Sequence, residues 1–244
     1  STPSPTPRAQ DTATGKDVTF KGQGGDVLGY LARPSNQAPG STNPGVIVIH
    51  ENRGLVDHIK DVTRRYADAG FIALAVDLLS RNGGTATTDA NTAPGALGRA
   101  NIADLVADLQ SGVSYLLEQP GVRKAGVGVT GFCFGGNYTW ELAIASQQIA
   151  AAVPYYGTVR NFDDLAKTRA AVLAIYGALD TRVTGQSDQV RQRLQQAGKT
   201  VEVKVYQGAD HAFFNDTGTR YNATAAQDAW TTTLDWFRKY LPTS

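Results

Sequence analysis

The chain has 244 residues, of which 41% are hydrophobic and 18% charged, and its formal net charge is +1. This balance is typical of a globular protein with a sizeable core, and without a Lys/Arg cluster it gives no basis for nucleic-acid binding. No apolar run approaches the ~20 residues of a membrane-spanning helix. The single cysteine excludes an internal disulfide.

The first 16 residues are rich in Ser, Thr and Pro and cannot bury a core. We expect residues 1–16 to form a disordered tail and residues 17–244 to form one domain. Processed exported proteins often begin in this way, and the chain contains no Met, a residue that is prone to oxidation where it is exposed. We therefore favour export, to the periplasm or out of the cell, over the cytoplasm. A chain trimmed for expression would look the same.

Strand and helix patterns alternate along the rest of the chain. Two alternating segments, 17–21 and 27–33, predict an antiparallel hairpin at a sheet edge. Further strands are predicted at 46–49, 71–76, 127–130, 149–155, 171–176 and 201–205, and helices at 57–70, 102–117, 137–145, 187–196 and 224–240. This alternation predicts an α/β fold with a doubly wound, mostly parallel sheet and helices on both faces.

One connection is unusually long. Residues 80–98 are rich in Gly, Thr and Asn and are predicted to form a loop. Because long loops in compact domains are commonly functional, we expect this segment to form a lid or rim of a site.

A glycine-rich turn follows the strand predicted at 127–130. It reads Gly131-Phe-Cys-Phe-Gly135 and is followed by a helical pattern. A strand, a sharp turn and a helix, with Gly two residues before and two after a nucleophile, form the nucleophile elbow of α/β-hydrolases. The glycines are needed because a Cβ at either position would collide with the reversing chain. Cys133 is therefore the candidate nucleophile, and the alternative is a small buried hydrophobic residue.

Chemically capable residues follow four predicted strands: His50 and Glu51, Cys133, Asp180, and His211. In open α/β sheets the reactive groups lie beyond the carboxyl ends of the strands. The chain order nucleophile, acid, histidine is the order that α/β-hydrolases use. A thiol needs a base, and the base needs an acid that fixes its tautomer. The sequence thus predicts a triad of Cys133, His211 and Asp180.

From Val27 onward the chain resembles the dienelactone hydrolase family of α/β-hydrolases. The matching motifs are His50-Glu-Asn-Arg-Gly54, Val76-Asp-Leu-Leu-Ser-Arg81, Gly131-Phe-Cys-Phe-Gly-Gly136, Gly177-Ala-Leu-Asp180 and His211-Ala-Phe-Phe214. The resemblance implies the same triad. It also implies that Glu51 contacts the resting thiol and moves away when substrate binds. The oxyanion hole would be formed by the backbone N–H groups of Phe134 and Asn52.

The resemblance also concerns substrate binding. Family members that act on dienelactone hold its carboxylate with two arginines. Arg81 matches the first position, whereas Asn215 stands at the second. Arg53 or Arg220 could compensate, so we predict Arg81 and Arg53 as substrate-binding residues and leave dienelactone itself open.

His50 and Glu51 also suggest a zinc motif. H-E-x-x-H needs a second His four residues after the first, and position 54 is Gly. His58 is expected at the surface near the start of a helix. We therefore predict no metal and no cofactor.

The predicted function is hydrolysis of small esters or lactones through a covalent thioester, by a protein expected to be a monomer. A carboxylesterase with broad specificity for bulkier or polymeric esters is an alternative. Two alternatives are not enzymes: a thiol redox sensor, which needs an exposed thiolate of low pKa, and an α/β-hydrolase scaffold used for binding.

Overall fold

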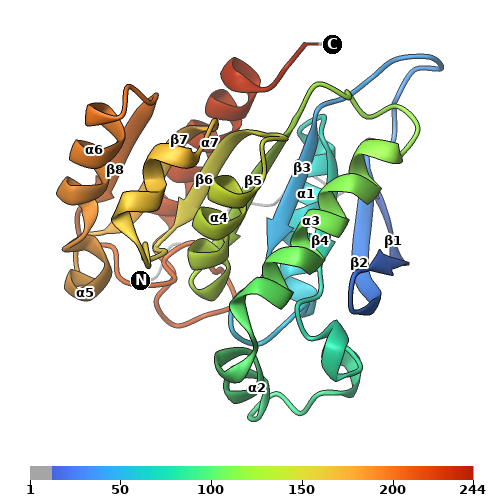
Figure 1. The fold of residues 1–244 in the computed structure, drawn as a ribbon, viewed down its shortest axis with the longest axis horizontal. Coiled ribbons are helices and arrows are strands. Elements are labelled where there is room, and N and C mark those ends of the chain that lie inside the picture. Colours follow the sequence, from blue (N-terminus) through green and yellow to red (C-terminus); the bar gives the residue numbers. More distant parts are fainter. Residues whose placement is uncertain (1–12, 244) are drawn as a thin grey trace, which may run out of the picture.

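The structure is a computed structural model and describes residues 13–243. Within this range one sheet has the strand order β1-β2-β4-β3-β5-β6-β7-β8 (Figure 1). The strands are β1 Thr14–Gly22, β2 Gly25–Arg33, β3 Gly45–Ile49, β4 Ile72–Val76, β5 Val127–Phe132, β6 Ile149–Tyr155, β7 Ala171–Gly177 and β8 Val201–Tyr206. β2 is antiparallel to β1 and to β4, and all other neighbouring strands are parallel. The predicted hairpin and mostly parallel sheet are confirmed.

Helices cover both faces of the sheet, as predicted. They are α1 Asp57–Asp68, α2 Ala93–Arg99, α3 Ile102–Glu118, α4 Phe134–Ala145, α5 Thr181–Thr184, α6 Ser187–Gln196 and α7 Ala223–Tyr240. In Figure 1, α3 and α4 lie in front of the sheet, and α1 and α7 lie behind it. On the rear face Tyr66 of α1 packs against Trp230 and Phe237 of α7. Those ring contacts join the two helices over the centre of the sheet.

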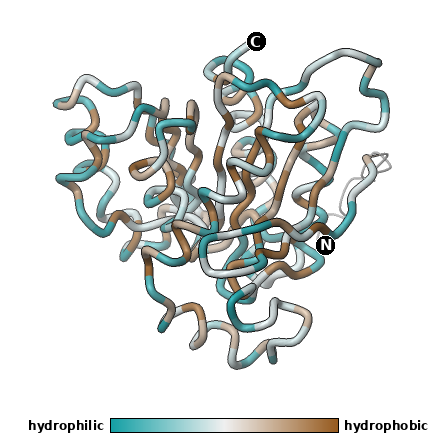
Figure 2. The backbone as a smooth tube through the Cα atoms, turned by 45° about the vertical axis from the view of Figure 1, so that its right-hand side comes forward, coloured by the Kyte–Doolittle hydropathy of each residue, from teal (hydrophilic) through white to brown (hydrophobic). Residues whose placement is uncertain are grey.

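The central strands carry continuous apolar sequence because both of their faces are covered. Every residue of β3, β4, β5 and β7 is buried. The apolar chain is concentrated in the interior, where Figure 2 shows the strands in brown. β8 lies at the sheet edge and none of its residues is fully buried, which agrees with its predicted place as an outer strand.

The predicted tail is too long at its C-terminal end. Residues 14–16 belong to β1, where Thr14 pairs with Arg33 and Gly15 with Ala32 of β2. Strand pairing uses backbone groups, so it does not require the apolar side chains on which the prediction relied. Ala13 is also ordered, because its backbone N–H donates a 2.8 Å hydrogen bond to Asp68, and residues 1–12 of the predicted tail lie outside the described residues.

Residues 80–98 are more ordered than predicted. They contain two 3₁₀ turns, Ser80–Asn82 and Thr85–Thr87, and most of α2. A proline in its first turn starts α2, which buries Ala93 and Leu97. The composition suggested a structureless loop because the Gly, Thr and Asn residues around α2 obscure its two buried positions. Figure 1 shows this segment and α2 beyond the lower end of the sheet.

Candidate active site

The chain reverses sharply between β5 and α4. Cys133 lies at the turn with φ 58° and ψ −114°, a conformation that is rare for a residue with a side chain. The turn is closely packed: a Cβ at Gly131 would lie 2.3 Å from the carbonyl oxygen of Gly135, and one at Gly135 would lie 2.3 Å from that of Ile49. The backbone therefore has the geometry that the glycine spacing predicts, and it holds Cys133 at the carboxyl end of the sheet.

His211 and Asp180 lie in contact although 31 residues separate them. Asp180 follows β7 and His211 follows β8, and these strands are parallel neighbours. The Nδ1 atom of His211 lies 2.5 Å from Oδ2 of Asp180. Because Nδ1 is engaged by the carboxylate, Nε2 is the ring nitrogen left for proton transfer. This contact is the arrangement of a histidine base oriented by an acid.

The Cys133 thiol is protonated in the resting protein. Burial and the nearby Glu51 carboxylate raise its pKa to about 11. The backbone amide of Phe134, Arg220 and Arg182 favour the thiolate, but their effect is smaller. At neutral pH the thiol therefore keeps its proton until a base removes it or Glu51 moves.

Glu51 is held by a neutral partner. Nδ2 of Asn215 donates a hydrogen bond of 2.7 Å to Oε2 of Glu51. Asn215 is the position at which the resemblance leads us to expect an arginine. Because an amide carries no charge, this hydrogen bond does not compensate the negative charge of Glu51. The carboxylate therefore still raises the pKa of the Cys133 thiol.

His50 and Asp77 are buried and organise the strand ends around the site. Nε2 of His50 accepts a 3.0 Å hydrogen bond from the backbone N–H of Leu78, and burial lowers the pKa of the imidazole. Asp77 accepts hydrogen bonds from the backbone N–H groups of Leu79 and Thr85 and from the Thr85 hydroxyl. These two side chains have structural partners and are not presented to a substrate.

Arg81, which the sequence predicts to bind substrate, is paired with acidic residues of α3. Its guanidinium forms a two-point ion pair with Asp108, at 2.8 and 2.9 Å, and lies 3.6 Å from Asp104. Asp108 is 1% exposed and needs a cation to compensate its charge. Arg81 therefore has a partner within the fold, and its contact with a substrate stays a prediction. Arg53 is exposed, and we find no ion pair between it and another residue of the described chain.

His58 is buried, and the predicted surface position is wrong. Its side chain is 5% exposed, and Nδ1 lies 3.4 Å from Oδ1 of Asp216. Asp216 also pairs with Arg65 at 2.6 Å. The contact joins α1 to the segment that follows His211, so the histidine is buried by a partner 158 residues away that no local pattern could indicate.

Two residues near the thiol escaped the sequence prediction. Tyr156 directly follows β6 and packs against His211, with 5.1 Å between the ring centroids. Arg182 lies in α5, two residues after Asp180. Both lie just beyond strand ends, so the rule that located Glu51 and Asp180 could also have identified them.

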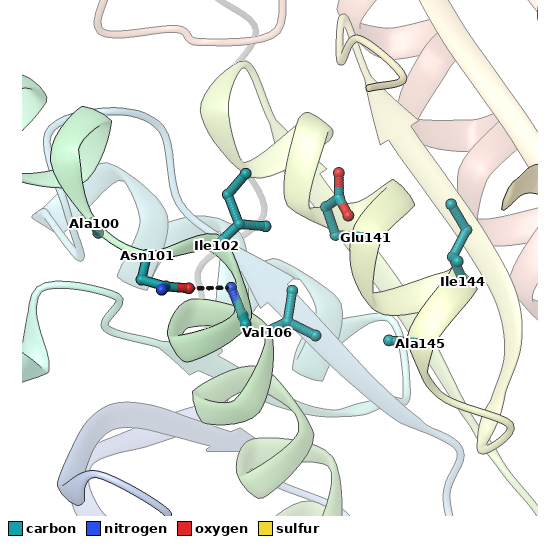
Figure 3. A pocket seen from close by; sticks show the side chains of 8 residues that line it. Ala100, Asn101, Ile102, Val106, Glu141, Ile144 and Ala145 are labelled. Carbon is teal, nitrogen blue, oxygen red and sulfur yellow. Dashed lines mark hydrogen bonds between the residues drawn. The ribbon is translucent and has the colours of Figure 1, made fainter. Parts of the chain in front are cut away.

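A surface groove of about 660 Å³ lies away from the triad. It is lined by the start of α3 and one side of α4, and Figure 3 shows Ile102 and Val106 facing Glu141 and Ile144 across it. A smaller groove of about 270 Å³ is lined by Arg81, Arg99 and their neighbours. Cys133, Asp180 and His211 line neither groove.

Residues 13–243 contain neither a candidate metal site nor a helix that could span a membrane. In this range no group of three or more His, Cys, Asp or Glu side chains is arranged to hold a metal ion. The helices described there are also too short or too polar to cross a membrane.

The fold and the site define an α/β-hydrolase: a mostly parallel sheet with a strained turn at Cys133 after β5 and a histidine–carboxylate pair beyond β7 and β8. The dienelactone hydrolase family matches residues 27–241, and the chain belongs to that family. The resemblance noted in the sequence is thereby confirmed.

Individual relatives agree with this assignment. A Methylorubrum extorquens protein named "Putative carboxymethylenebutenolidase" is 33% identical over 92% of this chain and 80% of its own length. The crystal structure titled "Putative Dienelactone Hydrolase" from Klebsiella pneumoniae superposes with a TM-score of 0.85, 32% identity, and coverage of 94% of this chain and 100% of that one. The structure of a dienelactone hydrolase-like promiscuous phosphotriesterase from metagenomic libraries superposes with a TM-score of 0.80 and 27% identity. The match covers 94% of this chain and 99% of that one.

Proposed function

We propose that the protein hydrolyses small ester or lactone bonds with Cys133 as nucleophile, His211 as base and Asp180 as the acid that orients the base. The 2.5 Å contact between His211 and Asp180, together with a cysteine at a strained turn after β5, is the observation that carries this proposal. Membership of the dienelactone hydrolase family, and relatives named as a carboxymethylenebutenolidase and a lactonase, support it.

The first half of the reaction forms a thioester. Nε2 of His211 takes the thiol proton as Sγ of Cys133 bonds to the substrate carbonyl carbon, whose oxygen becomes an oxyanion. The backbone N–H groups of Phe134 and Asn52 hold this oxyanion. The carbonyl then re-forms, the bond to the alkoxy oxygen breaks, and His211 returns the proton to the leaving alcohol.

The second half regenerates the thiol. His211 removes a proton from water, whose oxygen attacks the thioester carbonyl. The bond to Sγ breaks, the acid leaves, and the sulfur recovers a proton from the imidazolium. Asp180 stabilises the imidazolium in both halves, and no cofactor takes part.

Cys133→Ala and His211→Ala test the triad. We expect each to abolish release of p-nitrophenol from a panel of short-chain esters while the thermal unfolding midpoint changes little. Cys133→Ser is the matched variant, since it keeps a weaker nucleophile and should retain a small fraction of the activity. Full activity of purified Cys133→Ala would refute the proposal.

Glu51→Gln tests the role of the carboxylate. Because the negative charge of Glu51 raises the pKa of the thiol, its removal should lower that pKa and speed alkylation of Cys133 by iodoacetamide about tenfold at pH 8. Glu141→Gln, which removes a carboxylate from the groove of Figure 3, is the control. An unchanged alkylation rate would remove Glu51 from the mechanism.

The substrate class remains a proposal of small neutral esters or lactones. Arg81 is paired with a buried aspartate and Asn215 is neutral, so neither is available as a cation for a substrate carboxylate. These two observations favour broad specificity for small esters over restriction to dienelactone, and they leave Arg182 and Arg220, which act on the Cys133 sulfur, as the cations nearest a substrate carboxylate. Comparing kcat/KM for a neutral ester and for a carboxylate-bearing lactone separates the two candidates, because only the restricted enzyme prefers the lactone.

A further inference from the structure

Tyr156 follows the last residue of β6, whose backbone is hydrogen-bonded to Cys133. The preceding residue, Tyr155, accepts a 3.2 Å hydrogen bond from the backbone N–H of Cys133 through its carbonyl oxygen. Tyr156 itself has φ 38°, which few residues other than glycine adopt. Strained backbone of this kind persists where the surrounding structure holds it, and it commonly lies at functional sites.

The Tyr156 ring packs against His211 and against two aromatic rings, Phe213 and Phe132. Its centroid lies 5.1 Å from that of His211, 5.6 Å from Phe213 and 6.4 Å from Phe132, the residue before Cys133. The side chain is 1% exposed. These contacts fix the ring, so the hydroxyl group has one position at the site.

That hydroxyl group is not used by the fold. It is buried and makes no hydrogen bond of normal geometry to the described residues, although the Phe214 backbone amide is near enough to act on its oxygen. The neighbouring Tyr155 differs, because its hydroxyl contacts Thr233 and the Ala229 carbonyl oxygen. Because the Phe214 amide is itself a donor, it can bind only the oxygen of the Tyr156 hydroxyl, and the hydroxyl proton has no acceptor among the described residues. A buried donor in this state is costly unless a partner appears during function.

Two negative groups of the site lie close to this hydroxyl. Burial is the largest cause that raises the pKa of Tyr156 well above its usual value, and Glu51, Tyr155 and Cys133 in their ionised forms add to it in that order. The phenol is therefore neutral at any working pH and keeps a proton that it can donate in a hydrogen bond. Tyr176 of β7 is a useful contrast: its hydroxyl is also buried without a partner, yet burial alone raises its pKa.

We propose that the Tyr156 hydroxyl donates a hydrogen bond to the sulfur of Cys133 when the thiolate forms, which makes Tyr156 a catalytic residue of the hydrolysis. This inference rests on the proposed function, because it requires Cys133 to act as the nucleophile. The proton stays on the phenol oxygen throughout, and the thiol proton still passes to His211. The other charged groups that act on the sulfur are Glu51, Arg182 and Arg220.

Tyr156→Phe tests the inference, and Tyr176→Phe is its matched control. Alkylation of Cys133 by iodoacetamide is measured from pH 7 to pH 11 without substrate. Because a hydrogen bond to an anion is lost, Tyr156→Phe should react about tenfold more slowly at a fixed pH below the thiol pKa and shift the profile upward. Its kcat for p-nitrophenyl acetate should fall by a similar factor with KM unchanged, while Tyr176→Phe behaves as the wild type.

Two results would overturn the inference. Identical alkylation profiles for wild type and Tyr156→Phe would show that the hydroxyl does not reach the thiolate. Faster alkylation of Tyr156→Phe would show that the hydroxyl supports Glu51 instead. Failure of the proposed function is recognised separately, because Cys133→Ala would then retain full esterase activity whatever the alkylation profiles show. Equal thermal midpoints for the two phenylalanine variants exclude unfolding as the cause of any difference.

Discussion

At the scale of single residues, the position of a charge in the sequence did not reveal its partner. Arg81 follows a strand at the place where the family resemblance leads us to expect a substrate-binding arginine. Its partner is Asp108 of α3, which is 1% exposed. A carboxylate this deeply buried requires a cation, so the fold itself uses Arg81.

Replacement of Arg81 by Gln should therefore reduce stability more than substrate affinity. We expect Arg81→Gln to lower the free energy of unfolding by about 2 kcal/mol, because Asp108 loses a charged hydrogen-bond partner. KM for a carboxylate-bearing lactone should stay within twofold of wild type. Urea denaturation and steady-state kinetics measure the two quantities.

The control for this variant is Arg238→Gln, which breaks an exposed pair with Asp235. Exposed pairs contribute little, so its stability should match that of the wild type. A large increase in KM for Arg81→Gln, without loss of stability, would instead restore Arg81 as a substrate-binding residue.

At the scale of elements, the segment after His211 is fastened to α1. Asp216 pairs with Arg65 at 2.6 Å and lies 3.4 Å from His58. The adjacent Asn215 holds Glu51. The contacts of Asp216 with α1 therefore help to place both His211 and Glu51.

The contacts of Asp216 with Arg65 and His58 should weaken in acid. The contacts with His58 and Arg65 lower the pKa of the Asp216 carboxyl far below its usual value. Because the folded pKa is below the unfolded value of about 3.9, the contribution to stability is present above that pH and is lost as the pH falls toward the folded value. Asp216→Asn should thus lower the free energy of unfolding by about 1 kcal/mol at pH 7, and the difference should shrink by pH 3.

Urea denaturation of wild type and variant at both pH values measures this difference. Asp188→Asn removes a carboxylate that is 92% exposed and serves as the control. A difference for Asp216→Asn that stays constant from pH 7 to pH 3 would contradict an ionic origin.

The elements themselves were largely predictable because buried strands and amphipathic helices have strong patterns. β6 and α6 begin and end where the apolar patterns place them. The failures lie where backbone pairing or one buried turn decides the structure: residues 14–16 join β1 without apolar side chains, and α2 buries only Ala93 and Leu97. Neither leaves a periodic signal long enough to recognise.

At the scale of the whole molecule, sheet topology explains why the main site residues could be proposed from sequence. The carboxyl ends of the parallel strands β3, β5 and β7 meet at one edge, so residues after these strands converge. Side-chain partners across that edge were not predictable. Asn215 and Glu51 are 164 residues apart, and only the assembled fold brings them into contact.

Thr85 connects two of the segments that follow strands at this edge. Its hydroxyl accepts a 2.7 Å hydrogen bond from the backbone N–H of Leu55 and donates one of 2.8 Å to Asp77. The segment 51–55, which carries Glu51 and Asn52, is thereby tied to β4 through the residues predicted as a lid. Thr85→Ala should reduce kcat for p-nitrophenyl acetate severalfold and the free energy of unfolding by about 1 kcal/mol, because both bonds are lost.

Thr85→Ser and Thr87→Ala are the controls that identify the cause of this loss. Serine keeps the hydroxyl and should restore kcat, whereas Thr87 bonds only within its own segment, to the Gly84 carbonyl oxygen, and its loss should leave kcat unchanged. If Thr85→Ala and Thr87→Ala lowered kcat equally, the decisive property would be the order of the whole 80–98 segment. If Thr85→Ala kept full activity, the segment 51–55 would hold its position through its own contacts, and the residues after β4 would act only as a rim.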